Sequence, residues 1–169
     1  SRETTLVFIR RFNISAPLTI LFAHHSPNPF VASKMMYCLR DIAENDAKIL
    51  TLWFNSTLNV LQVFLDRIET GGAYVGLSKY SLLDSYILNP LKLSKEQKDA
   101  ILGLYDKIKS VEFPSLLKQL QDRFPARVEI DKLMLRVLGF GGDEINRILD
   151  YLYPALANEI QQLKTLMQG

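Results

Sequence analysis

The amino-acid sequence predicts an α+β fold, with a small β-rich N-terminal half packed on a long apolar helix and an all-helical C-terminal half. Two runs near the start are rich in β-branched and aromatic residues, an uncharged apolar run covers residues 49–65, and the later segments have helical periodicity. The pattern changes after Asn89-Pro90. We therefore predict two domains, an α+β domain over residues 1–90 and a helical domain over residues 91–169.

The β-rich half begins with an expected strand over residues 5–12. A second strand over residues 17–23 is expected to pair with it as a hairpin. Residues 24–29 contain two prolines and predict a loop, and residues 30–39 predict a third strand. The first predicted strand begins within a few residues of the start of the sequence, with no sheet of its own before it. We therefore expect the sequence to be part of a larger protein.

A long helix is expected from Asp41 to about Ile68. Its apolar residues cover most of its circumference, which predicts a helix buried on most sides. Asn55, Ser56 and Thr57 interrupt this surface, and such side chains compete for backbone hydrogen bonds inside a helix. We interpret them as structural, with their hydrogen bonds satisfied by a neighbouring strand or loop, and contact with something polar outside the helix is the alternative.

The second half contains four predicted helices. The first begins with a capping box, in which Ser94 and Gln97 are expected to exchange hydrogen bonds between side chain and backbone. Pro114 and Pro125 suit the first turns of the next two helices, and Gly139 suits the end of the third. A continuous apolar stripe predicts a long last helix.

Composition limits the possible classes of protein. The chain has 169 residues, a hydrophobic content of 48% and a net charge of +2, which is ordinary for a folded domain and only mildly basic. Cys38 is the only cysteine, so no intramolecular disulfide is possible, and we expect a cytoplasmic protein. The uncharged run is too short and too polar for a membrane span, so no membrane partner is expected.

The sequence offers no candidate catalytic residue. It contains no glycine-rich phosphate loop and no Cys/His cluster with metal spacing. His24 and His25 are adjacent, and on a strand they would point to opposite faces, so we interpret them as residues without a catalytic role. We predict no catalytic, cofactor-binding or metal-binding site in this part of the protein.

The order of several short motifs resembles that of one known family. A basic hairpin precedes the helix motif Leu52-Trp53-Phe54-Asn55-Ser56-Thr57, and then follow Gly71-Gly72-Ala73-Tyr74-Val75, Lys79-Tyr80, a segment ending at Pro90, and Ser94-Lys95-Glu96-Gln97. This order, over about residues 5–110 and more loosely in the tail, resembles the C-terminal target-recognition region of adenine-specific DNA methyltransferases. It is also similar to specificity subunits of restriction-modification systems.

The resemblance implies a prokaryotic DNA sequence-recognition module that is non-catalytic by itself. Its implied partners are double-stranded DNA and a catalytic methyltransferase domain or subunit. S-adenosylmethionine is implied for the parent enzyme, and no cofactor is implied for this part. Such a module would supply base and phosphate contacts that offset the cost of extruding the target base.

Six residues are candidates for DNA contact: Arg10, Arg11, Lys34, Tyr74, Lys79 and Tyr80. Arg10 and Arg11 are neighbours on the predicted strand, so we expect one of them to face DNA. A surface or salt-bridge role for either arginine is the alternative. Likewise, Lys79-Tyr80 also suits a helix start that packs through its tyrosine.

A second hypothesis comes from a different class of protein. The near-neutral charge and the amphipathic helices after Ser94 suit a helical protein-interaction or regulatory module that docks a partner subunit. A basic surface built from Arg10, Arg11, Lys34 and Lys79 would favour DNA, whereas scattered charge would favour the interaction module. A small-molecule enzyme is the least supported class, because no polar groups converge in the sequence pattern.

Overall fold

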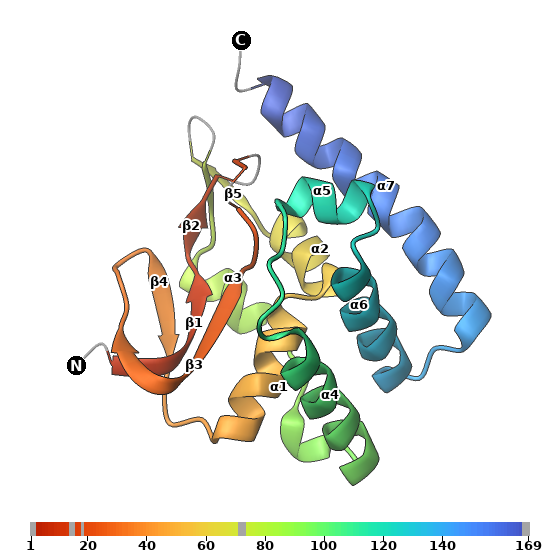
Figure 1. Cartoon of the computed structure of the whole chain (residues 1–169). Coiled ribbons are helices and arrows are strands. Elements are labelled where there is room, and N and C mark those ends of the chain that lie inside the picture. Colours follow the sequence, from red (N-terminus) through yellow and green to blue (C-terminus); the bar gives the residue numbers. More distant parts are fainter. Residues whose placement is uncertain (1–2, 14–15, 18, 71–73, 167–169) are drawn as a thin grey trace.

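Two small sheets form the N-terminal part of the protein, and one stretch of chain passes through both of them (Figure 1). The computed structural model describes residues 3–13, 16–17, 19–70 and 74–166, and for residues 68–70, 74 and 166 it describes the backbone alone. The first sheet has the order β3-β1-β4 and is antiparallel, with β1 Glu3–Ile9, β3 Ala23–Val31 and β4 Met36–Leu39. The second has the order β2-β6-β5, with β2 Arg11–Phe12, β5 Ile68–Thr70 and β6 Tyr74–Gly76.

The pairing partner of the first strand differs from the predicted one. Of the strand expected over residues 17–23, the described residues 17 and 19–22 are not in a strand, and only Ala23 is. Strand β3 covers the predicted loop instead, with Phe8 opposite Ala23 and Glu3 opposite Val31. Residues 26–29 lie where the register of the pair is irregular, and β3 is an edge strand. Pro27 and Pro29 are tolerated there because an edge strand with an irregular register does not need every backbone N–H. The predicted third strand over 30–39 is therefore split between the end of β3 and β4.

The predicted single helix from Asp41 to Ile68 is two helices. The first, α1, runs over Glu44–Phe54 and the second, α2, over Thr57–Leu65. Ser56 lies between them with an extended backbone, and its side chain caps α2 by accepting from the Asn59 backbone N–H. The apolar periodicity is correct for both pieces, but the strong N-cap preference of serine divides them.

The second half is helical, as predicted. Its helices are α4 Lys95–Ile108, α5 Leu116–Gln121, α6 Pro125–Val137 and α7 Gly142–Leu166, and they are preceded by α3 Lys79–Asp84 and a short 3-10 turn, Pro90–Lys92. The capping box of Ser94 and Gln97 is present in full. Gly139 follows α6 with a φ of 97°, a conformation that glycine adopts at little cost.

One hydrophobic core runs through both halves. Helix α1 contacts β1 and β3 on one side and α4 and α6 on the other, so it lies between the first sheet and the helical layer (Figure 1). Buried side chains from every part of the chain belong to the same cluster, from Leu6 and Phe8 to Leu156 and Ile160. The arrangement confirms the predicted α+β fold, with a small β-rich half packed on an apolar helical segment and a helical half behind it.

Candidate nucleic-acid interface

Three segments that are distant in the sequence meet around Arg10. Arg10 is the bend between β1 and β2, and its backbone N–H donates to the Met35 carbonyl at 2.9 Å. Its own carbonyl accepts from the Leu77 backbone N–H, also at 2.9 Å. The turn between β3 and β4 and the connection between β6 and α3 are therefore both fastened to this one residue.

Tyr37 on β4 contacts both Arg10 and Leu77. Its hydroxyl donates to the Leu77 carbonyl at 2.9 Å, and the Arg10 guanidinium lies over its ring, 5.7 Å from the centroid. An exposed cation–aromatic contact of this kind contributes about 0.5–1 kcal/mol. Tyr37 was not among the predicted residues, because its contact with Arg10 depends on which strand follows which turn.

The predicted basic residues lie close to this centre. Lys34 precedes Met35 in the turn, and Lys79 is two residues beyond Leu77, so both backbone positions lie within about 14 Å of Arg10. Both side chains are exposed, as are those of Arg10 and Arg11. Arg11 pairs with Gly76 in the second sheet. The structure thus brings four predicted cations to one region.

The two predicted tyrosines are placed differently. Tyr80 is in the first turn of α3, and 78% of its surface is exposed. Its side chain therefore does not pack against the protein, contrary to the alternative interpretation of Lys79-Tyr80. Tyr74 begins β6, but its side chain lies outside the described residues, as do Gly71, Gly72 and Ala73. The predicted role of the Gly-Gly motif therefore stays a prediction.

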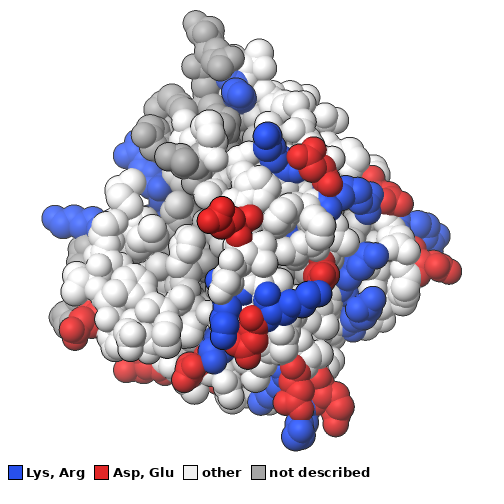
Figure 2. Space-filling model, in the orientation of Figure 1, with Lys and Arg blue, Asp and Glu red and all other residues white. Residues whose placement is uncertain are grey.

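Some of the charges elsewhere on the protein are paired. Among the described residues, six ion pairs are Lys48–Glu44, Arg67–Glu159, Lys95–Asp99, Lys107–Glu129, Lys109–Asp106 and Arg123–Asp150. Within the described ranges, no carboxylate pairs with Arg10, Lys34 or Lys79. The same is true of other exposed basic side chains, among them Arg136 and Arg147, so it is the proximity of the first three that sets them apart. Figure 2 shows basic and acidic side chains alternating over the helices, whereas on this face the described residues along the upper-left margin, near β2 and the β3–β4 turn, include basic ones and no acidic ones.

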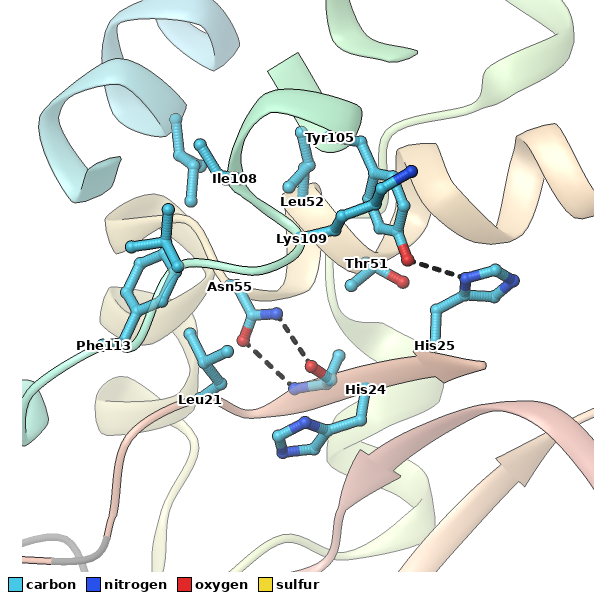
Figure 3. Close-up of a pocket in the computed structure, with 13 residues that line it drawn as sticks. Leu21, His24, His25, Thr51, Leu52, Asn55, Tyr105, Ile108, Lys109 and Phe113 are labelled. Carbon is cyan, nitrogen blue, oxygen red and sulfur yellow. Dashed lines mark hydrogen bonds between the residues drawn. The ribbon is translucent and has the colours of Figure 1, made fainter. Parts of the chain in front are cut away.

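A small cavity of about 120 Å³ lies where β3 meets α1 and α4. His24 and His25 border it and leave the strand in opposite directions, and Asn55 faces the backbone of Ala23 (Figure 3). The polar groups around it bond to the protein itself: Thr51 donates to the Ala47 carbonyl at 2.7 Å, and Asn55 bonds to β3. The cavity therefore presents few free donors or acceptors to a ligand.

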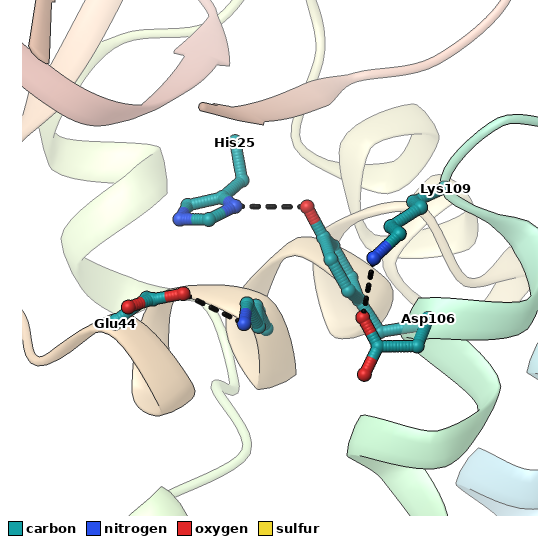
Figure 4. A network of polar contacts seen from close by, with 6 residues as sticks. His25, Glu44, Asp106 and Lys109 are labelled. Atoms are coloured by element: carbon teal, nitrogen blue, oxygen red, sulfur yellow. Dashed lines mark hydrogen bonds and ion pairs between the residues drawn. The ribbon is translucent and has the colours of Figure 1, made fainter. Parts of the chain in front are cut away.

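A chain of polar contacts lines one side of this cavity (Figure 4). His25 Nδ1 lies 2.8 Å from the Tyr105 hydroxyl, while its buried Nε2 has no hydrogen-bond partner among the residues that the structure describes. Burial and the nearby Lys48 lower the pKa of His25, and Glu44 opposes them. Burial also raises the pKa of Tyr105. His25 is therefore neutral at pH 7 and links the sheet to α4.

The Asn-Ser-Thr motif is structural, as interpreted from the sequence. The Asn55 side chain accepts from the backbone N–H groups of Phe22 and Ala23, at 2.7 and 3.1 Å, and donates to the Ala23 carbonyl at 2.8 Å. Thr57 donates its backbone N–H and its hydroxyl to the carboxylate of Asp131. All three side chains are buried, so no free polar group of this motif reaches the surface.

The partners of that motif form a buried polar network between the two halves. Asp131 also accepts from the Tyr153 hydroxyl at 2.6 Å, and Arg127 donates to the side chain of Gln119 and the carbonyl of Asn55. Burial raises the pKa of Asp131, while Arg127 and the hydrogen bonds oppose it. Because every member is buried and bonded to protein, the network holds the fold together and offers nothing to a substrate.

Neither a cluster of metal-binding side chains nor a helix able to cross a membrane occurs in the described part of the chain. No group of three or more histidine, cysteine or acidic side chains gathers there to hold a metal ion. No helix in it combines the length and the apolar character that a membrane crossing needs. Comparisons with family models, with curated proteins and with solved structures found no match to this chain.

Proposed function

We propose that this chain is the DNA sequence-recognition module of an adenine-specific DNA methyltransferase from a restriction-modification system, and that it is non-catalytic by itself. The supporting observation is the convergence of Arg10, Lys34 and Lys79, which lack acidic partners among the described residues, from three segments of the chain. In a nearly neutral protein, such a local excess of positive charge suits a polyanion. In this proposal the parent enzyme acts in the cytoplasm. It binds S-adenosylmethionine and contains the catalytic domain or subunit.

Fluorescence anisotropy with random duplex DNA, from low to physiological salt, tests the proposal. We expect micromolar or weaker affinity that falls steeply with salt, because phosphate contacts release counterions. A variant with Arg10→Ala, Lys34→Ala and Lys79→Ala should lose most of this binding, and the slope of log affinity against log salt should decrease by about 2–3.

A matched control removes the same charge elsewhere. Arg136, Arg147 and Lys164 are exposed on α6 and α7, so their triple alanine variant has an equal net charge but an intact cluster. We expect it to bind DNA nearly as the unmodified chain does. Absence of binding at low salt, or an equal loss in both triple variants, would contradict the proposal.

The alternative function is a helical protein-interaction or regulatory module, and one observation favours it. Leu83, Tyr86 and Leu91 are 68, 84 and 81% exposed along the segment between β6 and α4. The Tyr86 carbonyl accepts from the side chains of Trp53 and Gln62, and its backbone N–H donates to Gln62, so this apolar ridge is held in place. If the chain does not bind DNA, the ridge is where a partner subunit should be sought.

A further inference from the structure

We infer that Arg10 reads a guanine base and that Tyr37 is the residue that positions it, whereas Lys34 and Lys79 contact phosphates. This inference rests on the proposed function and names the specificity-determining residue of the same surface. The supporting observation is that the Arg10 guanidinium lies over an aromatic ring without an ion pair, whereas other arginines over rings are ion-paired.

Three arginines among the described residues lie over aromatic rings. Arg67 lies over Phe64 and is also paired with Glu159, and Arg123 lies over Tyr153 and is also paired with Asp150. Arg10 lies over Tyr37 in the same way, but no carboxylate of the described residues takes up its N–H groups. The ring therefore orders a guanidinium whose N–H groups pair with no described carboxylate and can meet an external acceptor.

The backbone beneath Arg10 is fixed as firmly as its side chain. Hydrogen bonds to Met35 and from Leu77 hold both of its peptide groups, and Tyr37 bonds to the same Leu77. Because Tyr37 also packs against the core, the ring under the guanidinium is itself anchored. An arginine ordered in advance loses little side-chain entropy when it binds, which favours contacts that need a defined orientation.

A planar guanidinium with two parallel N–H groups matches two acceptors side by side. Guanine O6 and N7 present such a pair in the major groove, and so do two oxygens of one phosphate. Lys34 and Lys79 are lysines on exposed, flexible stems, and lysine binds phosphate as a point charge without needing an orientation. The geometry therefore assigns the directional contact to Arg10 and the non-directional contacts to the two lysines.

The test begins with selection of bound duplexes from a random pool by the unmodified chain. We expect enrichment of a motif with a G·C pair whose preference decreases about 5- to 150-fold in Arg10→Lys, which keeps the charge but loses the paired donors. The salt slope of Arg10→Lys should stay unchanged. Duplexes with 7-deazaguanine at that position, which lack the N7 acceptor, should bind the unmodified chain more weakly and Arg10→Lys no differently.

Two variants at Tyr37 separate positioning from general stability. Tyr37→Leu removes the ring and should reduce the preference for the G·C pair more than it reduces the affinity for random DNA. Tyr37→Phe keeps the ring and loses the hydroxyl that bonds to Leu77, so it should retain most of the preference. A merely structural role of Tyr37 would reduce both quantities in parallel.

Two results would contradict the assignment of Arg10 to guanine. If the chain binds DNA but 7-deazaguanine has no effect, and Arg10→Ala weakens all sequences equally with a salt slope lower by about 1, Arg10 contacts phosphate and the inference is wrong. The proposed function would survive that result. If the chain binds no DNA at low salt, the proposed function and this inference are both wrong.

Discussion

His25 shows how one residue links acid sensitivity to the packing of the two halves. It bonds to Tyr105 of α4 through Nδ1, and its other ring nitrogen is buried without a partner among the described residues. Burial lowers the pKa values of both histidines of the chain. The folded protein therefore favours neutral imidazoles, whereas the unfolded chain titrates near its ordinary pKa of about 6.5.

We therefore expect the free energy of unfolding to decrease as the pH falls from 7.5 to 5.5. In that window the unfolded chain binds protons that the folded chain does not, so acid favours unfolding. Urea midpoints at pH 7.5, 6.5 and 5.5 measure the effect, and a His24→Gln, His25→Gln variant should show a smaller change over the same range. Imidazole pKa values at or above 6.5, measured by NMR in the folded protein, would contradict this explanation.

The sequence could predict that basic residues distant in the chain would lie near one another, but it could not predict which ring would contact Arg10. Arg10, Lys34 and Lys79 were predicted from charge and element order, and the structure brings them together. Tyr37 was missed because nothing within its own strand indicates that Arg10 will lie over it. Cation–aromatic pairs in general have no sequence pattern, because they join positions that only the fold brings together.

Helix α1 ends in a side chain that bonds to a strand. Asn55 makes three hydrogen bonds to the backbone of Phe22 and Ala23, and only 3% of its surface is exposed. Because these backbone groups have no water to replace the lost partner, removal of the amide leaves buried groups unsatisfied.

We expect Asn55→Ala to lower the free energy of unfolding by about 2–4 kcal/mol. Urea denaturation measures the change. Asn158→Ala is the matched control, because Asn158 is exposed on α7 and its loss should change stability by no more than about 0.5 kcal/mol. Similar losses in the two variants would show that the bonds of Asn55 to the strand contribute little.

Element by element, local signals predicted more than pairing signals did. The capping box at Ser94, the helix start at Pro125 and the end at Gly139 depend on neighbours within four residues, and all three lie where they were predicted. The prediction for Pro114 was wrong: it precedes α5, and Ser115 is the N-cap of that helix. The second strand was misplaced because its pairing with β1 is set by the sheet, where an edge position accepts Pro27 and Pro29. The break at Ser56 was missed because apolar periodicity continues across it.

At the scale of the whole molecule, the two predicted domains share one core. Buried residues of both belong to a single cluster, and the Thr57–Asp131–Tyr153 hydrogen bonds and the Arg67–Glu159 ion pair also cross between the halves. Neither half covers its own apolar surface alone, because α1 is buried by the first sheet and by α4 and α6 together.

We therefore expect the chain to unfold in one cooperative transition. Trp53 is the only tryptophan and lies in the first half, so its fluorescence reports on that half. Far-UV circular dichroism is dominated by helices, most of which lie in the second half. The two urea curves should coincide within error. Separate midpoints would instead show that residues 1–90 and 91–169 are independent folding units.

The hydrogen bonds of Asn55 also have a consequence for self-association. An open strand edge is a template for the strands of other molecules, and β3 is such an edge. The amide of Asn55 occupies the N–H and C=O of Ala23 at the start of that edge, and Pro27 and Pro29 provide no N–H further along it. A helix terminus thus blocks one end of the edge, and two prolines interrupt its middle. Both features protect the edge of β3 against aggregation by strand addition.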